Sequence, residues 1–510
     1  MVLKNPNFSK LFDMDLSNEE LAELLRKDNL NSNITLETKE IINFRTALEK
    51  RITQVENKST IKEFRKVLNN MSKFHNSLSN TKQMKIENVY KIKTLNNYVG
   101  NHMKTSNTNL EDITELTHYL NELITIQKDF LIDNDVEVLR QIDFLSNIVT
   151  EQIGSYMLDV GNGSKSAEVS PTLADVETYF SIINDQITEN LEPNMSYMSL
   201  SPLYNTSSKF ILKNKDMKDQ LNVNVNHEII QYLKKQNIEH IGAQNGGVQL
   251  LLDTEEFIDE KEVQFTFKVI YSHENLPTDA FEHGIIVDFS LIKDGKQSNQ
   301  MSKSAKLTFD LDYFDFGSDI NYDNISIFRY DDELAVWVPV GGVYNEMTNS
   351  ISTLRNHLSQ YTVMQGNQNF RDTGELWAQA EITSLLNKGI IESSDTFRPE
   401  DSILIKELET WVSKAYMNDN SVECISEEVA SNVDFAIIVA NALREYDLNY
   451  TYANTIELSS ISNDIKSNGD LTDIAFALEM ELIQIDENGD IIEKNLTRAE
   501  AASLLKKIYG

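Results

Sequence analysis

The feature that most constrains the fold of this chain is an order of four short motifs, which recurs between residue 366 and residue 510. The most complete copy runs through residues 376–382 (LWAQAEI), 388–391 (KGII), 396–399 (TFRP) and 403–407 (ILIKE). A motif order that recurs in this way indicates a repeat architecture.

The last copy ends in the clearest motif, residues 496–500 (LTRAE), which opens a short amphipathic pattern. Thr497 can cap a helix there, and Glu500 stands three residues later, which is the spacing of a capping box. A fainter middle copy has residues 430–435 (ASNVDF) at the place of this motif. The sequence therefore predicts three related helical units.

This order of W-A-x-x-x-I, G-I-I, F-x-P and I-T-R-A-E resembles the repeat of the S-layer homology (SLH) family of bacterial surface proteins. The resemblance implies three copies, at about 370–416, 417–457 and 458–510, that form an all-α pseudo-threefold region. It also implies that grooves between the copies hold secondary cell-wall polysaccharide, which typically bears a pyruvyl ketal.

The resemblance transfers a ligand set residue by residue, with gaps. An arginine guanidinium suits a ketal carboxylate, a helix N-terminus adds N–H donors, and an indole offers its face to a sugar ring. Ile405 stands at the arginine position of the first copy, and Asn432 and Asp434 replace arginine and glutamate in the middle copy. The candidate polysaccharide-binding residues are Thr497, Arg498, Glu500, Lys406, Glu407, Asn432, Asp434 and Trp377.

A structural role for the same residues is the competing interpretation. Trp377 stands in the pattern with Ile382, Leu385, Ile390 and Phe397, so we expect it in the core of the repeat, where truncation to alanine would unfold the region. Arg498, in turn, would only be a surface partner of a nearby glutamate.

Residues 166–365 change from helical to alternating periodicity, as at Val263, Phe265, Phe267, Val269 and Tyr271, which predicts a β-rich, sandwich-like module. A hairpin is expected from residues 326–330 and 334–340, and a short helix over residues 228–235. Residues 220–365, with WVPVGG at 337–342, resemble a β-module that often precedes SLH repeats.

Residues 1–165 carry apolar residues at spacings of three and four, which predicts an antiparallel helical bundle. Only Glu115 and His118 fit the E-x-x-H pair that a di-metal bundle needs twice, so we expect no metal there. Across the chain the sequence indicates no catalytic residues and no cofactor.

Composition limits the partners. The 510 residues carry a formal net charge of −34, which argues against a nucleic-acid or anionic-membrane partner. The single cysteine, Cys424, excludes an intramolecular disulfide and a multi-thiolate metal site. We expect no membrane span, and residues 1–15 have no apolar core of signal-peptide length.

These observations predict a multidomain α+β protein, with a helical bundle (1–165), a β-sandwich-like module (166–365) and a C-terminal SLH-like region (366–510). The expected function is that of a non-enzymatic surface or S-layer-type protein at the cell wall, bound to pyruvylated polysaccharide or another envelope component. One alternative is a self-assembling subunit of a spore, cell envelope or cytoplasmic structure, whose SLH-like region contacts protein. Another is a carbohydrate-active enzyme.

Overall fold

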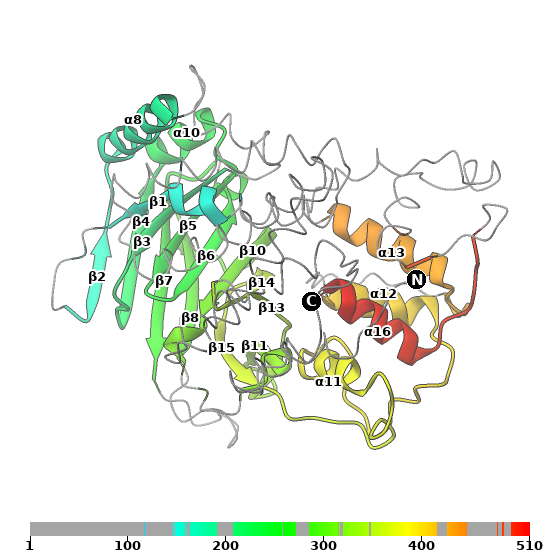
Figure 1. The fold of residues 1–510 in the computed structure, drawn as a ribbon. Coiled ribbons are helices and arrows are strands. Elements are labelled where there is room, and N and C mark those ends of the chain that lie inside the picture. Colours follow the sequence, from blue (N-terminus) through cyan, green and yellow to red (C-terminus); the bar gives the residue numbers. More distant parts are fainter. Residues whose placement is uncertain are drawn as a thin grey trace, which may run out of the picture. The chain divides into compact units, whose positions relative to one another are not determined.

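The computed structural model describes residues 117, 146, 148–158, 160, 164–190, 208–257, 259–271, 285–314, 316, 320–345, 348–415, 426–445, 477, 482–483 and 491–509. The helical bundle expected over residues 1–165 lies almost wholly outside these residues, as does Cys424, so that expectation stays a prediction. The described part is a mixed α and β structure with two β-sheets (Figure 1).

The first sheet has seven strands in the order β1 (Ser155–Met157), β3 (Lys209–Asn214), β5 (His240–Asn245), β6 (Val248–Asp253), β10 (Gln300–Asp310), β14 (Ser350–His357) and β13 (Val343–Asn345). The second has the order β12 (Val336–Pro339), β11 (Ile325–Asp331), β15 (Gln360–Gln365), β8 (Ile286–Lys293), β7 (Glu262–Ile270), β4 (Gln220–Asn226) and β2 (Ser166–Val169), with β9 (Lys296–Gln297) paired to β8. Most neighbours are antiparallel, but β1–β3, β3–β5 and β2–β4 are parallel.

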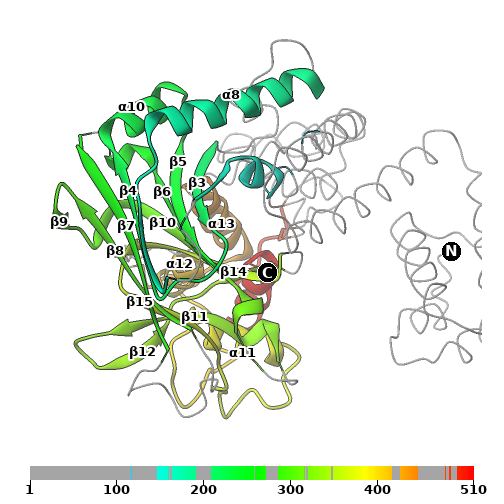
Figure 2. The same cartoon turned by 90° about the vertical axis from the view of Figure 1, so that its left-hand side faces the viewer.

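The helical elements are α8 (Leu173–Asn190), α10 (His227–Lys235), α11 (Gln379–Asn387), α12 (Ile405–Ala415), α13 (Asn432–Glu445) and α16 (Arg498–Tyr509), with short 3-10 turns η1 (Thr254–Phe257), η2 (Leu311–Tyr313) and η3 (Tyr322–Asn324). Helices α8 and α10 lie beside each other at one end of the strands (Figure 2). Among the described residues, no helix is both long and apolar enough to cross a membrane.

Alternating burial explains why the central residues form sheets. Along β7 every second side chain is buried, and Phe265 and Phe267 are inaccessible to solvent. Phe289 of the second sheet lies 6.1 Å, centroid to centroid, from Phe309 of the first sheet in an edge-to-face arrangement. Each sheet therefore contributes one apolar face to a shared aromatic core.

Two local expectations for this region are confirmed. The expected hairpin is the antiparallel pair β11 and β12, with Tyr330 opposite Trp337. The expected short helix is α10, which begins after Asn226, whose side chain accepts a hydrogen bond from the backbone N–H of Ile229.

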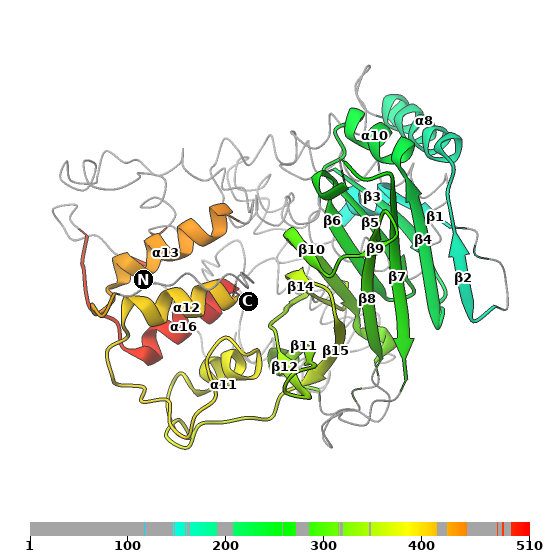
Figure 3. The same cartoon turned by 180° about the vertical axis from the view of Figure 1, so that it is seen from behind.

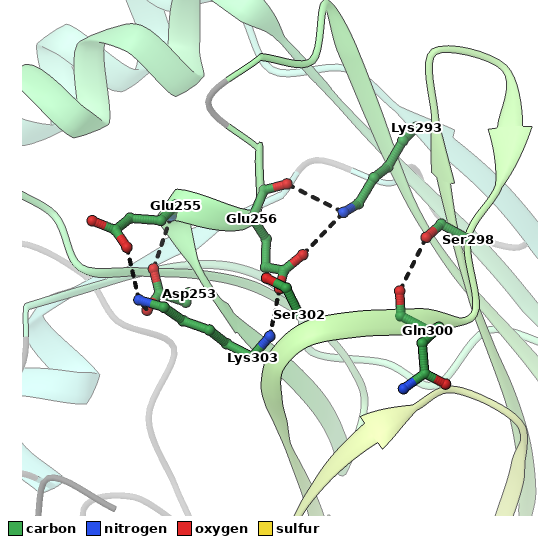
Figure 4. A network of polar contacts seen from close by, with 8 residues as sticks. All are labelled: Asp253, Glu255, Glu256, Lys293, Ser298, Gln300, Ser302 and Lys303. Carbon is green, nitrogen blue, oxygen red and sulfur yellow. Dashed lines mark hydrogen bonds and ion pairs between the residues drawn. The ribbon is translucent and has the colours of Figure 1, made fainter. Parts of the chain in front are cut away.

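A polar network fastens η1 to the sheets (Figure 4). The Glu256 carboxylate accepts hydrogen bonds from the backbone N–H of Lys303 at 2.6 Å, from Lys293 Nζ at 3.1 Å and from the Ser302 hydroxyl. The Glu256 side chain is only 4% exposed. Although burial raises its pKa, these hydrogen bonds hold the pKa of Glu256 below its ordinary value.

The WVPVGG segment (residues 337–342) forms hydrogen bonds with two side chains of the C-terminal helical region. The Gly342 N–H donates to Tyr509 Oη at 3.0 Å, and Lys388 Nζ donates to the Gly342 carbonyl at 3.0 Å. Gly342 has a φ of 146°, and a Cβ there would lie 2.6 Å from Ile351 Cδ1, so the position requires glycine. Backbone conformation and the nearby Ile351 side chain thus explain the second glycine of the motif.

The C-terminal helices α11, α12, α13 and α16 are drawn from yellow to red in Figure 3, and their buried side chains form one apolar core. Its centre includes Phe397 and Trp411, whose rings stack with centroids 5.9 Å apart. The expected core residues Ile382, Leu385, Ile390 and Phe397 are all buried. Trp377 is the exception, and its position is described below.

Candidate functional site

A closed ring of three backbone hydrogen bonds organises the C-terminal region. The N–H of Ile403 donates to the carbonyl of Leu496 at 3.1 Å, that of Leu496 to Ala430 at 2.9 Å, and that of Ala430 to Ile403 at 2.9 Å. All three residues are buried. The three segments that lead into α12, α13 and α16 therefore occupy equivalent positions around one centre.

A second ring lies at the first residue of each of these helices. The N–H groups of Ile405, Asn432 and Arg498 each donate, at 2.9 Å, to a carbonyl of the next segment. The accepting residues, Glu428, Lys494 and Asp401, each stand four positions before the first residue of a helix. The hydrogen-bonding register thus pairs the same three positions that the sequence motifs aligned.

Two of the three helices begin with a capping box. In α16 the Thr497 N–H donates to Glu500 Oε2 at 3.0 Å, and the Glu500 N–H donates to Thr497 Oγ1 at 3.2 Å. In α13 Ser431 and Asp434 make the same reciprocal pair at 2.7 and 3.2 Å. Glu500, Thr497 and Asp434 are therefore engaged in holding helix termini.

The first copy lacks this cap because Leu404 has no side-chain oxygen. Its glutamate, Glu407, instead pairs with the guanidinium of Arg498 from the last copy. The Arg498 Nε–H also donates to the carbonyl of Phe397 at 2.7 Å. Because Glu407 does not cap its own helix, its carboxylate can pair with Arg498 and so connect the first copy to the last.

Arg498 is buried at this junction and is not a surface residue. It is 8% exposed, and its guanidinium lies over the rings of Phe397 and Trp411, at 4.7 and 5.3 Å from their centroids. Burial lowers the pKa of Arg498 to about 10, which still leaves it charged at neutral pH. The expectation that Arg498 is only a surface partner of a nearby glutamate is wrong, because its acceptors lie in another copy.

Of the other two candidate residues, Lys406 lies at the surface and Asn432 is buried. Lys406 pairs with Glu427 at the surface. The Asn432 amide is buried, donates to the Ile492 carbonyl at 3.0 Å and accepts from the Lys494 N–H at 2.8 Å. Asn432 therefore joins the middle copy to the last one, as Arg498 joins the last copy to the first.

One cavity of about 380 Å³ lies beside this second junction. Its wall brings together three of the sequence-predicted residues, Trp377, Asn432 and Glu500. The remaining lining residues are Leu482, Ile492, Lys494, Leu496, Ser503 and Leu504. The cavity is therefore built from the beginning of the first copy and from the middle and last copies.

The expectation that Trp377 belongs to the core is wrong, because its side chain is 64% exposed. Helix α11 begins only at Gln379, so Trp377 precedes the helix and does not follow its buried stripe. The indole stands instead in the wall of the cavity. The exposed indole therefore offers an apolar face and an N–H donor at the edge of the cavity.

Sequence reasoning missed Lys494 and Ser503. Lys494 Nζ lies 2.8 Å from Glu500 Oε1, and Ser503 follows Glu500 by three residues on α16. Residues three apart on a helix share a face, so the candidate Glu500 was the sequence signal that could have pointed to Ser503. No comparable signal marked Lys494.

Within the described residues, no group of three His, Cys, Asp or Glu side chains is arranged to hold a metal ion. Comparisons of the chain with protein-family models, with curated proteins and with solved structures found no match.

Proposed function

We propose that this chain is a non-enzymatic bacterial surface protein, and that residues 366–510 are an SLH-type region that attaches it to secondary cell-wall polysaccharide. In this proposal a helical bundle, expected over residues 1–165 but ending before strand β1 (Ser155–Met157), and a β-sandwich-like module precede three SLH-like copies with pseudo-threefold symmetry. The protein would act at the cell wall or in an S-layer.

The two rings of hydrogen bonds carry this proposal. A repeat whose copies contribute one equivalent segment each to a common centre is what three SLH-like motifs in sequence lead one to expect. The rings use backbone groups only, so they support the repeat even in the middle copy, where the motif is faint. The cavity beside Trp377 adds a concave surface of the size that small ligands occupy, roughly 300–1,000 Å³.

The test is binding of the full-length protein to purified cell-wall sacculi, before and after extraction of their secondary polysaccharide. We expect co-sedimentation with intact sacculi and none with extracted ones. Binding that survives extraction, or no binding to either, would refute attachment through the polysaccharide. Self-association of the free protein in the second case would favour the alternative of an assembly subunit.

Two variants assign the binding to the cavity. Trp377→Ala removes the exposed indole and should reduce co-sedimentation with little change in stability, because a 64% exposed side chain contributes little to the core. Leu334→Ala is the matched control, since Leu334 is 69% exposed and lies in the β11–β12 hairpin, away from the cavity lining. Equal effects of the two substitutions would remove the cavity from the proposal.

A further inference from the structure

The chemistry of the cavity beside Trp377 restricts the kind of sugar that it can take, and the first constraint is at the N-terminus of α16. A helix N-terminus binds anions through its free N–H groups. Here the N–H of Arg498 donates to the Asp401 carbonyl at 2.9 Å and that of Ala499 to the Pro399 carbonyl at 3.1 Å. The Glu500 N–H is taken by the Thr497 hydroxyl. The first turn therefore has no donor left for an acidic ligand at these three residues.

The second constraint concerns the arginine. The guanidinium of Arg498 contacts Phe397, Trp411 and Glu407, and none of these three residues lines the cavity. Its carboxylate partner is already supplied by the chain. A ketal carboxylate in the cavity would thus not meet the guanidinium without breaking its ion pair with Glu407.

The third constraint is the balance of charge in the cavity wall. Among the described residues of the wall, the basic group of Lys494 and the acidic group of Glu500 form an ion pair at 2.8 Å. Burial raises the pKa of Glu500, but the hydrogen bonds from Lys494 and Thr497 bring that pKa below its ordinary value. The carboxylate is therefore ionised at neutral pH, and the two charges compensate each other.

The groups that remain suit an uncharged ligand. The indole of Trp377 is exposed, and Leu482 and Leu504 add apolar surface. Within the described part of the chain, no hydrogen bond joins the Trp377 Nε1–H or the Ser503 hydroxyl to another residue. A pyranose ring offers an apolar C–H face for the indole and hydroxyl groups for these two polar atoms.

From these observations we infer that the cavity formed by Trp377, Ser503 and the Lys494–Glu500 pair binds an uncharged sugar residue of the wall polysaccharide, and that the acidic ketal is not what it recognises. The inference rests on the proposed function, because it takes a wall polysaccharide as the ligand. It adds that an uncharged sugar ring, and not the ketal carboxylate, provides the binding free energy in this cavity.

The experiment compares the affinity of the full-length protein for the purified polysaccharide before and after mild acid removal of its pyruvyl ketals. We expect affinities that agree within about twofold, a difference of about 0.4 kcal/mol. A tenfold or greater loss, about 1.4 kcal/mol, would overturn the inference and leave the proposed attachment intact. Absence of binding to both polymers would instead refute the proposed function, and this inference with it.

Salt provides a second readout on the same protein. Between about 0.1 and 1 M salt the Debye length falls from about 10 to about 3 Å, which weakens recognition of an exposed anion but not stacking on an uncharged ring. We expect the affinity to stay constant across this range. A steady decrease with salt would contradict the inference.

Two substitutions then separate stacking from charge. Trp377→Ala should lower the affinity about tenfold, or about 1.4 kcal/mol, whereas Lys494→Gln should change it by less than about threefold. A larger loss of affinity for Lys494→Gln than for Trp377→Ala would show that the cavity recognises an acidic group of the polysaccharide. Lys414→Gln, at a partly exposed lysine paired with Glu392 outside the cavity lining, controls for loss of a positive charge.

Discussion

Replacing Arg498 by methionine should destabilise the C-terminal region by about 2–4 kcal/mol. Removal of one partner from a buried ion pair is unfavourable by about 3–5 kcal/mol, because it leaves the other charge unpaired. The side chain of Arg498 is 9% exposed but that of Glu407 is 28% exposed, so water relieves part of the penalty. Loss of the hydrogen bond to the Phe397 carbonyl and of the contacts with two aromatic rings opposes this relief.

The assay is urea unfolding of the full-length protein followed by tryptophan fluorescence. Trp411 is 3% exposed and lies against the guanidinium, so it reports on this junction directly. Making all variants in a Trp337→Phe, Trp377→Phe background removes the signals of the other two indoles and leaves Trp411 as the reporter. Lys406→Met is the matched control, because Lys406 pairs with Glu427 at the surface and such pairs contribute about 0–1 kcal/mol.

A double-mutant cycle tests whether the two charges are coupled. Arg498→Met combined with Glu407→Met replaces the ion pair by apolar groups of similar length, and such replacements are often neutral or stabilising compared with a single removal. We expect the double variant to be more stable than Arg498→Met alone. A loss below about 1 kcal/mol for Arg498→Met, or strictly additive losses in the cycle, would refute the argument.

Three further predictions concern the other buried charges. Glu256→Gln should lower the free energy of unfolding, measured in urea, by about 2–3 kcal/mol. The control Glu255→Gln, at a 67% exposed side chain, should change it by less than about 1 kcal/mol. Equal losses for the two variants would contradict a stabilising role of the network in Figure 4. Burial lowers the pKa of Lys388 to about 8, so between about pH 8 and 10 the unfolded chain binds a proton that the folded chain does not. The free energy of unfolding should therefore rise by about 2 kcal/mol over this range relative to that of Lys388→Met. A difference between the two proteins that does not change with pH would refute this prediction. Glu151, shortly before β1, pairs with Lys209 Nζ of β3 at 3.2 Å. Burial raises the pKa of Glu151, but Lys209 and Lys306 bring it down to about 2, so its contribution to stability should be complete above about pH 4.5 and disappear toward pH 2. Glu151→Gln should flatten this loss of stability in acid, and an unchanged loss would refute the prediction.

Sequence periodicity was sufficient for elements whose burial is set by their own secondary structure. The alternation of Phe265 and Phe267 predicted strand β7 because a two-layer core buries one face of every strand. The same holds for Ile382 and Leu385, which repeat at the helical spacing of α11 and are buried. In both cases a local pattern carries the information.

The burial of a side chain that contacts residues far along the chain could not be predicted from the local sequence pattern. Trp377 fits a repeat motif, yet its surroundings are set by Asn432, Ile492 and Ser503, which lie far along the chain. Lys388 resembles any helix-terminal lysine, but it is buried because Gly342 and Tyr509 meet at its ammonium group. A single sequence does not specify such encounters, since they depend on how whole elements pack.

The two backbone rings explain why the repeat motifs differ so much between copies. A ring made of N–H and carbonyl groups requires only that each segment follow the same path, so the side chains at its positions are free to change. At the first helical residue the chain has Ile405, which packs on the core, Asn432, which holds the backbone beside the cavity, and Arg498, which pairs with Glu407. One structural position thus has three different uses. The departures from the repeat pattern are therefore where the junctions acquire separate chemistry, and a cavity of about 380 Å³ lies at the junction beside Trp377.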